Sequence, residues 1–213
     1  MSPEASLLAI ASALLIGAMS PGPSFLVVSR ISIAQSRLHG IAAAIGTGAG
    51  GTVFASMALL GLVALLNQWS WLHSAVKIAG GLYLIRLGVQ IWRGAKEPLP
   101  HASPASSESR SLQRAFLSGC LTQLSNPKTA VVYASVFAAL LPTSPPAWLL
   151  VTVPPLVFAL EFGWYATVAS TFSSAYARST YLCAKIWVDR LAGAVMTLLG
   201  LRLILDAVGD RKP

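Results

Sequence analysis

The chain has 213 residues, of which 55% are hydrophobic and only 10% are charged, and its formal net charge is +8. Soluble globular domains have roughly 25% charged residues. This composition excludes an ordinary soluble domain and indicates a membrane protein. The positive charge would suit a nucleic acid, but most of it lies in segments between apolar runs, so no nucleic-acid partner is expected.

Six apolar runs come close to or exceed the ~20 residues that a helix needs to cross the hydrocarbon layer. The first run has no basic n-region and is longer than the ~7–15-residue core of a signal peptide, so it predicts a retained span. The sequence therefore predicts an all-α integral membrane protein with six transmembrane helices. In chain order the runs cover residues 6–29, 41–66, 72–92, 115–141, 148–172 and 191–208.

The first run is interrupted near its middle by Ser20-Pro21-Gly22-Pro23. A proline inside a helix removes a backbone hydrogen bond and clashes with the preceding turn, at a cost of about 3 kcal/mol. In lipid, no water replaces the lost bond. A single break of this kind is equally consistent with a packing kink and with a binding site.

Residues 95–111 are rich in proline, serine and charge and predict a cytoplasmic linker. The linker would separate two three-helix repeats, residues 1–94 and 112–213. Because three is an odd number, the repeats are expected to cross the membrane in opposite senses, as inverted-topology repeats do. Each repeat would begin with a broken helix, because the fourth run contains the counterpart break Ser125-Asn126-Pro127-Lys128.

Breaks at corresponding positions of two halves indicate a midplane binding site built from discontinuous helices. Asparagine is a favoured N-cap and proline a favoured first helical residue, so half-helices are expected to begin at Pro127 and, after Ser20 or Gly22, at Pro23. Their N-termini would present free N–H groups and partial positive charge to a carboxylate, and Lys128 would add a full charge. The predicted substrate-binding residues are Ser20, Pro21, Gly22, Pro23, Ser24, Asn126, Pro127, Lys128 and Thr129.

Basic residues follow the first, third and fifth runs, whereas residues 66–71 and 142–147 contain no lysine or arginine. By the positive-inside rule the basic side is cytoplasmic, so both termini are predicted to be periplasmic. The basic residues assigned to these cytoplasmic segments are Arg30, Arg37, Arg93, Lys96, Arg110, Arg114, Arg178, Lys185 and Arg190.

Glu161 lies near the centre of the fifth run. A charged carboxylate at that depth costs ~2.5–3.5 kcal/mol on insertion scales, and function is the default interpretation of such a residue. We predict that Glu161 couples transport to protons. The alternative is a fixed ion pair with Lys128 or Arg86.

Glycines in three of the runs are predicted to mediate helix packing. Gly46 and Gly50 form a small-xxx-small stripe inside an apolar run, which favours close helix contact over a nucleotide-binding loop. Gly81 with Gly88, and Gly193 with Gly200, are seven residues apart, so each pair lies nearly on one face of its helix.

The sequence offers no catalytic or metal-binding constellation. Cys120 and Cys183 lack CxxC spacing, and His39, His73 and His101 are scattered. No metal or cofactor is expected. A membrane enzyme or thiol-electron carrier, and a non-transporting membrane scaffold, are the alternatives to a transporter.

Five segments of the chain together form a recognisable pattern: Pro21-Gly22-Pro23, His39 to Gly50, Lys77 to Gly88, Asn126-Pro127-Lys128 and Gly193 to Gly200. In these segments the sequence resembles the LysE/RhtB family of amino-acid exporters. The resemblance implies a secondary exporter of amino acids or their derivatives in the bacterial inner membrane, driven by the proton-motive force. It implies as partners an amino-acid-like substrate, protons and membrane lipid, and it leaves a homo-oligomer open.

Overall fold

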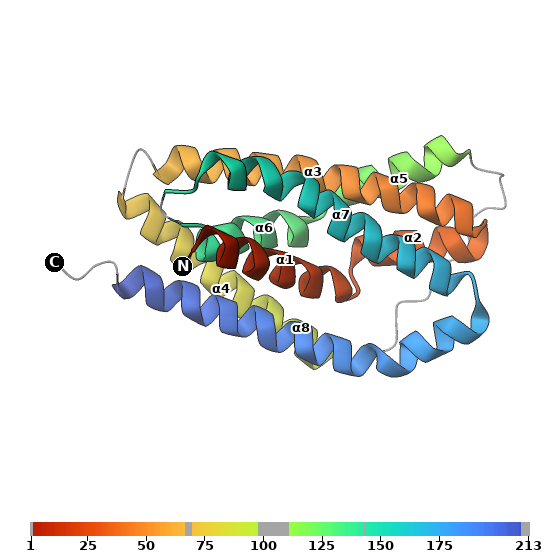
Figure 1. The fold of residues 1–213 in the computed structure, drawn as a ribbon. Coiled ribbons are helices and arrows are strands. Elements are labelled where there is room, and N and C mark those ends of the chain that lie inside the picture. The colour runs from red at the N-terminus through yellow and green to blue at the C-terminus, as the bar shows by residue number, and fades with distance from the viewer. Residues whose placement is uncertain (1, 67–69, 98–110, 143, 210–213) are drawn as a thin grey trace.

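The computed structural model describes residues 2–66, 70–97, 111–142 and 144–209. These residues form eight helices and no strand, so the predicted all-α class is confirmed (Figure 1). The helices are α1 (Pro3–Met19), α2 (Pro23–Ala34), α3 (Arg37–Leu66), α4 (Ser70–Gly94), α5 (Leu112–Leu124), α6 (Pro127–Leu140), α7 (Ala147–Phe172) and α8 (Ala175–Gly209).

Within the described residues, three helical segments are each long and apolar enough to cross a membrane: residues 37–62 of α3, all of α7 and residues 182–209 of α8. α1 and α2 would make a fourth span if the pair is counted as one, bent by 57° at the first break. α4 is long enough but carries Lys77, Arg86 and Arg93, while α5 and α6 have only 13 and 14 residues. The chain is a membrane protein, and its described residues contain three or four such spans by this measure, so the six predicted spans are not confirmed.

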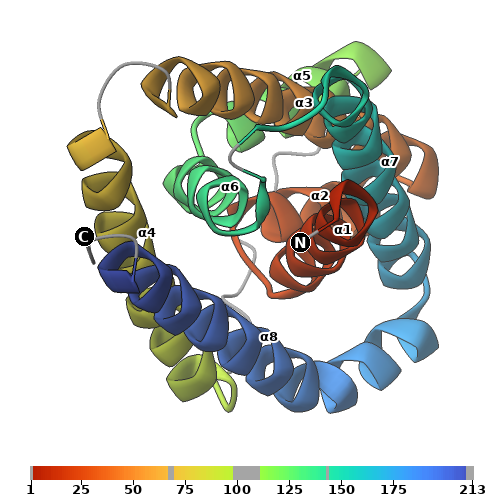
Figure 2. The ribbon, with the colours of Figure 1, turned by 60° about the vertical axis from the view of Figure 1, so that its left-hand side comes forward.

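α1 and α6 lie in the interior of the bundle, between a wall formed by α3, α5 and α7 and a second wall formed by α4 and α8 (Figure 2). α1 packs against α6, α7 and α8, and α6 also packs against α3 and α4. α1 begins and α8 ends at the same end of the bundle (Figure 1). The turn between α2 and α3 and the start of α5 lie at the opposite end, which we call the basic end.

The apolar core consists of two buried clusters separated at the level of the breaks. The larger cluster joins α1 and α6 to the outer helices through side chains such as Ile10, Leu84 and Phe137. The smaller cluster surrounds α2, with Phe25 edge-on to Phe172 at a ring-centroid distance of 5.3 Å. The segments that interrupt the first and fourth runs therefore lie between two apolar layers.

Glycine pairs bring the backbones of α4 and α8 into contact. A Cβ atom on Gly81 would lie 2.7 Å from the carbonyl oxygen of Gly200, and one on Gly88 would lie 2.5 Å from that of Gly193. The two helices are antiparallel, because the pairing joins 81 to 200 and 88 to 193. These are the four glycines whose seven-residue spacing predicted a packing face.

We expect Gly88→Ala to destabilise the protein by about 1–3 kcal/mol, since the added methyl group forces the two backbones apart. The matched control is Gly163→Ala in α7, where a Cβ would meet no atom within 4 Å. Thermal unfolding in detergent measures both. Equal melting temperatures for the two variants would contradict the close contact.

α3 also approaches its neighbours at glycines. A Cβ atom on Gly46 would overlap the carbonyl oxygen of Phe116 in α5, and one on Gly50 would lie 2.9 Å from that of Cys120. On the face toward α7, a Cβ on Gly48 would lie 3.1 Å from the Phe158 ring. The glycine-rich string therefore makes room for helices on two sides of α3.

The structure corrects the extent of two predicted segments. The first run was predicted to end at residue 29, but α2 continues to Ala34 and includes Arg30. Lys185 and Arg190 were predicted in a loop, but both lie within the 35-residue helix α8. Most of the predicted linker, residues 98–110, lies outside the described residues.

Interactions at the α4–α8 contact explain why α8 tolerates these charges. Lys185 forms a 2.8 Å ion pair with Asp189 and donates to the carbonyl oxygen of Ala95 at 3.3 Å, just beyond the end of α4. The guanidinium of Arg190 lies 5.7 Å from the ring centres of both Trp92 and Trp187. Lys185 and Arg190 thus both have interaction partners. α8 can therefore continue through this segment, although its charge content alone predicts a loop.

Candidate substrate site

The site begins with the two helix breaks. α2 begins at Pro23 with Gly22 as its N-cap, and α6 begins at Pro127 with Asn126 as its N-cap. The side-chain oxygen of Asn126 accepts a 3.1 Å hydrogen bond from the backbone N–H of Lys128. The predicted starts of both half-helices, at Pro23 and Pro127, are confirmed.

Buried polar side chains join the first break to the second. The hydroxyl of Ser24 donates to the side-chain oxygen of Gln123, and the amide of Asn126 donates to the same hydroxyl at 3.4 Å. All three side chains are at least 95% buried. Ser24 belongs to the first half of the chain and the other two to the second, so these bonds hold the halves together at the breaks.

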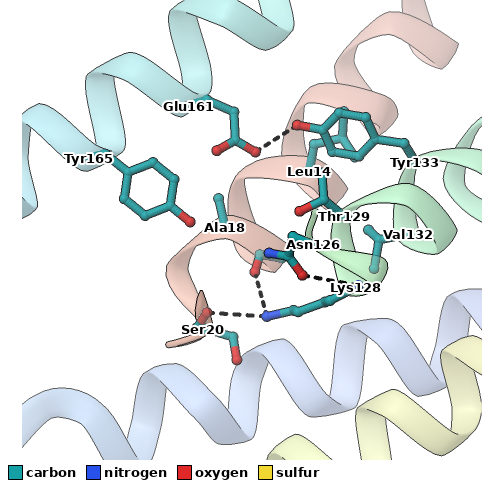
Figure 3. A pocket seen from close by; sticks show the side chains of 12 residues that line it. Leu14, Ala18, Ser20, Asn126, Lys128, Thr129, Val132, Tyr133, Glu161 and Tyr165 are labelled. Carbon is teal, nitrogen blue, oxygen red and sulfur yellow. Dashed lines mark hydrogen bonds between the residues drawn. The ribbon is translucent and has the colours of Figure 1, made fainter. Parts of the chain in front are cut away.

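Lys128 crosses from the second break to the end of α1. Its ammonium nitrogen donates to the backbone oxygens of Gly17 at 3.3 Å and Ser20 at 3.2 Å (Figure 3). The last carbonyls of a helix have no partner within it and carry partial negative charge. Lys128 therefore caps α1, a role that the sequence prediction did not include, and it retains a third N–H donor.

A small cavity of about 30 Å³ lies between the breaks and α7. This volume has room for water but is far smaller than an amino acid. Of the predicted substrate-binding residues, Ser20, Gly22, Asn126, Lys128 and Thr129 line it, whereas Pro21, Pro23, Ser24 and Pro127 do not. The remaining lining residues are Leu14, Gly17, Ala18, Val132, Tyr133, Glu161 and Tyr165.

Glu161 reaches the cavity from α7, on the side away from Lys128 (Figure 3). Its Oε1 accepts a 2.6 Å hydrogen bond from the hydroxyl of Tyr133, and its Oε2 is buried without a partner among the described residues. Arg86 is exposed. Among the described residues, neither Lys128 nor Arg86, the two ion-pair partners considered for Glu161, forms a salt bridge with it.

Gly51 in α3 gives the Tyr133–Glu161 pair its space. A Cβ atom there would lie 3.2 Å from the Tyr133 hydroxyl and 3.3 Å from Cγ of Glu161. Such contacts are tighter than ordinary van der Waals packing, so a larger residue would shift the carboxylate. The glycine string of α3 thus also supports one wall of the cavity.

Sequence reasoning missed Gln123, Tyr133 and Tyr165. Helical periodicity contained a usable signal for the two tyrosines, because Tyr165 lies four residues after Glu161 and Tyr133 four residues after Thr129. Gln123 is a polar residue in an apolar run shortly before the break. The four-residue spacing places each tyrosine about one helical turn from a residue that was predicted to belong to the site.

Comparison with known proteins identifies the family of this chain. The family model "LysE type translocator" matches residues 15–207. The chain belongs to this family. This translocator is accordingly a transporter and not an enzyme, and the family resemblance seen in its motifs is confirmed.

Relatives of the translocator cover almost its whole length. The threonine efflux protein of Escherichia coli K12 is 33% identical over 200 residues, which cover 93% of this chain and 97% of that protein. The threonine efflux protein of Salmonella typhi is 35% identical over 193 residues, 90% and 94% of the two chains. An uncharacterized membrane protein of Haemophilus influenzae is 26% identical over 198 residues, and no solved structure matches.

Proposed function

We propose that this translocator exports small neutral amino acids, threonine among them, across the bacterial inner membrane in exchange for protons. The observation that carries the proposal is the meeting of two broken helices at one cavity that contains a lysine and a glutamate. The two threonine efflux proteins, similar over more than nine-tenths of their length, support the choice of substrate.

The proposed binding mode follows from the charges of the cavity. A free amino acid carries one carboxylate and one ammonium group, and the lining contains one cation, Lys128, and one anion, Glu161. The carboxylate would bind at the N-termini of α2 and α6 and the third N–H of Lys128. Leu14, Ala18 and Val132 provide an apolar wall, which suits a side chain without charge.

Binding requires the site to widen, because a cavity of about 30 Å³ cannot enclose an amino acid. The hydrogen bonds of Lys128 to Gly17 and Ser20 join α1 to α6, so they are the contacts that a substrate carboxylate would compete with. Movement of α1 relative to α6 would thus accompany binding.

We assign proton coupling to Glu161. Its carboxylate lies at the cavity, and one of its oxygens has no hydrogen-bond partner in the described part of the chain, so a proton and the substrate's ammonium group would compete for the same acceptor. Exchange of substrate for protons requires such competition, because a proton that binds to Glu161 then releases the substrate. A carboxylate buried at membrane depth is a common element of proton relays.

Two inverted three-helix repeats remain our proposal for the architecture. α4 and the broken pair α5 and α6 would complete six spans. Helices at equivalent positions of the two halves run antiparallel. α4 and α8 do so along their glycine pairs. α3 and α7 do so as well, because Gly40 lies next to Ala169 whereas Gly51, further along α3, lies next to Val157, which is earlier in α7. An axis in the membrane plane relates inverted repeats in this way.

Transport by inverted membrane vesicles tests the function. Uptake into such vesicles corresponds to export from cells. With the interior acid, we expect threonine to accumulate in vesicles containing the protein and not in vesicles without it. A screen of neutral, acidic and basic amino acids in which none accumulates would contradict the proposal.

We expect both termini on the periplasmic side, because the basic end of the bundle should be cytoplasmic. A tag placed before Pro3 or after Gly209 should then be reached by a protease added to whole spheroplasts, while a tag inserted near residue 106 should be protected. Termini on opposite sides of the membrane would contradict the inverted repeats, because two three-span halves return the chain to its starting side.

A further inference from the structure

A groove of about 310 Å³ runs between α2 and α5, toward the basic end of the bundle. It is much larger than the central cavity, and four polar residues, Arg30, Gln35, Ser118 and Thr122, interrupt its apolar lining. We propose that this groove is the path by which substrate reaches the central site from the cytoplasm, and that Arg30 first binds the substrate's carboxylate there. The inference rests on the proposed export of amino acids.

Arg30 is available for an anionic ligand. None of the ion pairs or hydrogen bonds among the described residues involves its guanidinium, although it lines a groove beside Ile31 and Leu121. A guanidinium binds a carboxylate through two parallel hydrogen bonds, which also fix its orientation. Its position within α2, rather than in the loop expected from the sequence, places the charge inside the groove.

Gln35 supplies the complementary acceptor. Its side-chain oxygen is buried and has no hydrogen-bond partner among the described residues, and Gln35 is the C-cap of α2 in the same groove. An unpaired buried acceptor costs free energy, about 1–3 kcal/mol, unless a ligand or water satisfies it. Arg30 and Gln35 together offer a donor for a carboxylate and an acceptor for an ammonium group.

A second groove at the basic end shows that the polar lining is not a general feature of this surface. It lies between α3 and α5, has a volume of about 360 Å³, and is lined by Gln113 and six apolar residues that include Leu38, Ala42 and Phe116. An apolar groove of this kind suits lipid chains. The groove with Arg30 differs in composition while sharing α5 as one wall.

The hydrogen bond between Ser24 and Gln123 lies between the groove and the central cavity. Along α2 the cavity reaches Gly22 and the groove begins at Val27, with Ser24 between them. On the other chain segment the groove ends at Thr122 and the cavity begins at Asn126, with Gln123 between them. Substrate would therefore pass inward when this buried contact opens.

Thiol labelling tests whether water and substrate enter the groove. In a background in which Cys120 and Cys183 are replaced by alanine, we expect Thr122→Cys to react with a membrane-impermeant methanethiosulfonate reagent added to inverted vesicles. Threonine should slow that reaction. Ala42→Cys, in the apolar groove, is the matched control and should react little with this reagent.

Transport kinetics test the role of Arg30. We expect Arg30→Gln to raise the KM for uptake into inverted vesicles roughly tenfold, as loss of one charge-assisted hydrogen bond would, with the maximal rate retained. Arg37→Gln, an exposed charge at the start of α3 that does not line the groove, should have the wild-type KM.

The outcomes separate this inference from the function on which it rests. If wild-type protein transports threonine but Thr122→Cys is unreactive, reacts only with a lipid-soluble maleimide, or is not protected by threonine, the groove is not the entry path. A wild-type KM in Arg30→Gln overturns the role of that residue. Failure of wild-type protein to transport any amino acid would instead overturn the proposed function, while labelling of Thr122→Cys would still report whether water fills the groove.

Discussion

Lys128→Gln should weaken substrate binding by about 1.5–3 kcal/mol, the range for a hydrogen bond to a charged group, or roughly 10- to 150-fold in Kd. Glutamine keeps an N–H donor for the α1 carbonyls but removes the positive charge that the carboxylate requires. The protein should therefore fold, with a modest loss of stability from the weaker cap on α1. Calorimetric titration of the purified protein with threonine, alongside its melting temperature, measures both effects.

Lys185 provides the matched control for Lys128. Both lysines donate to backbone carbonyls at the end of a helix, α1 in one case and α4 in the other, but only Lys128 lines the central cavity. Lys185→Gln should lower the melting temperature and leave the affinity for threonine unchanged. Wild-type affinity in Lys128→Gln would show that this residue is only a structural cap.

Backbone chemistry made the half-helix starts predictable from the sequence. Asn126-Pro127 and Gly22-Pro23 both combine a residue suited to the N-cap with one suited to the first helical position, and both helices begin there. Likewise, the seven-residue spacing of Gly81 and Gly88 was enough to place both on one face of their helix, and α8 approaches both glycines. Such local rules depend on residues adjacent in the chain or on one face of one helix.

Contacts between distant segments were not accessible to this reasoning. The attachment of Lys128 to Gly17 and Ser20 spans more than a hundred residues, and no pattern near Lys128 reveals it. The length of α8 was mispredicted for a similar reason, because charges were counted without their tertiary partners. Lys185 and Arg190 are accommodated by Ala95 and Trp92 of the α4 segment, which the local sequence of α8 does not contain.

Glu161→Gln is expected to abolish the dependence of transport on a pH gradient. Glutamine has nearly the same volume, and its side-chain oxygen can accept the hydrogen bond from Tyr133, so the cavity should keep its shape. The variant cannot gain or lose a proton at this position. Uptake driven by an acid interior should fall to the level of vesicles without protein. Exchange of labelled for unlabelled threonine, which needs no proton movement, should persist but require a higher threonine concentration than in the wild type, because the variant also lacks the carboxylate proposed to accept from the substrate's ammonium group.

Asp189 distinguishes coupling from a general effect of removing a buried acid. Like Glu161 it is at least 95% buried and has one carboxylate oxygen without a partner among the described residues, but it pairs with Lys185 and does not line the cavity. Asp189→Asn should lower thermal stability while uptake still responds to the pH gradient. If Glu161→Gln also keeps full gradient-driven uptake, Glu161 is not the coupling residue. If exchange by Glu161→Gln keeps the wild-type dependence on threonine concentration, the substrate's ammonium group does not bind at this carboxylate.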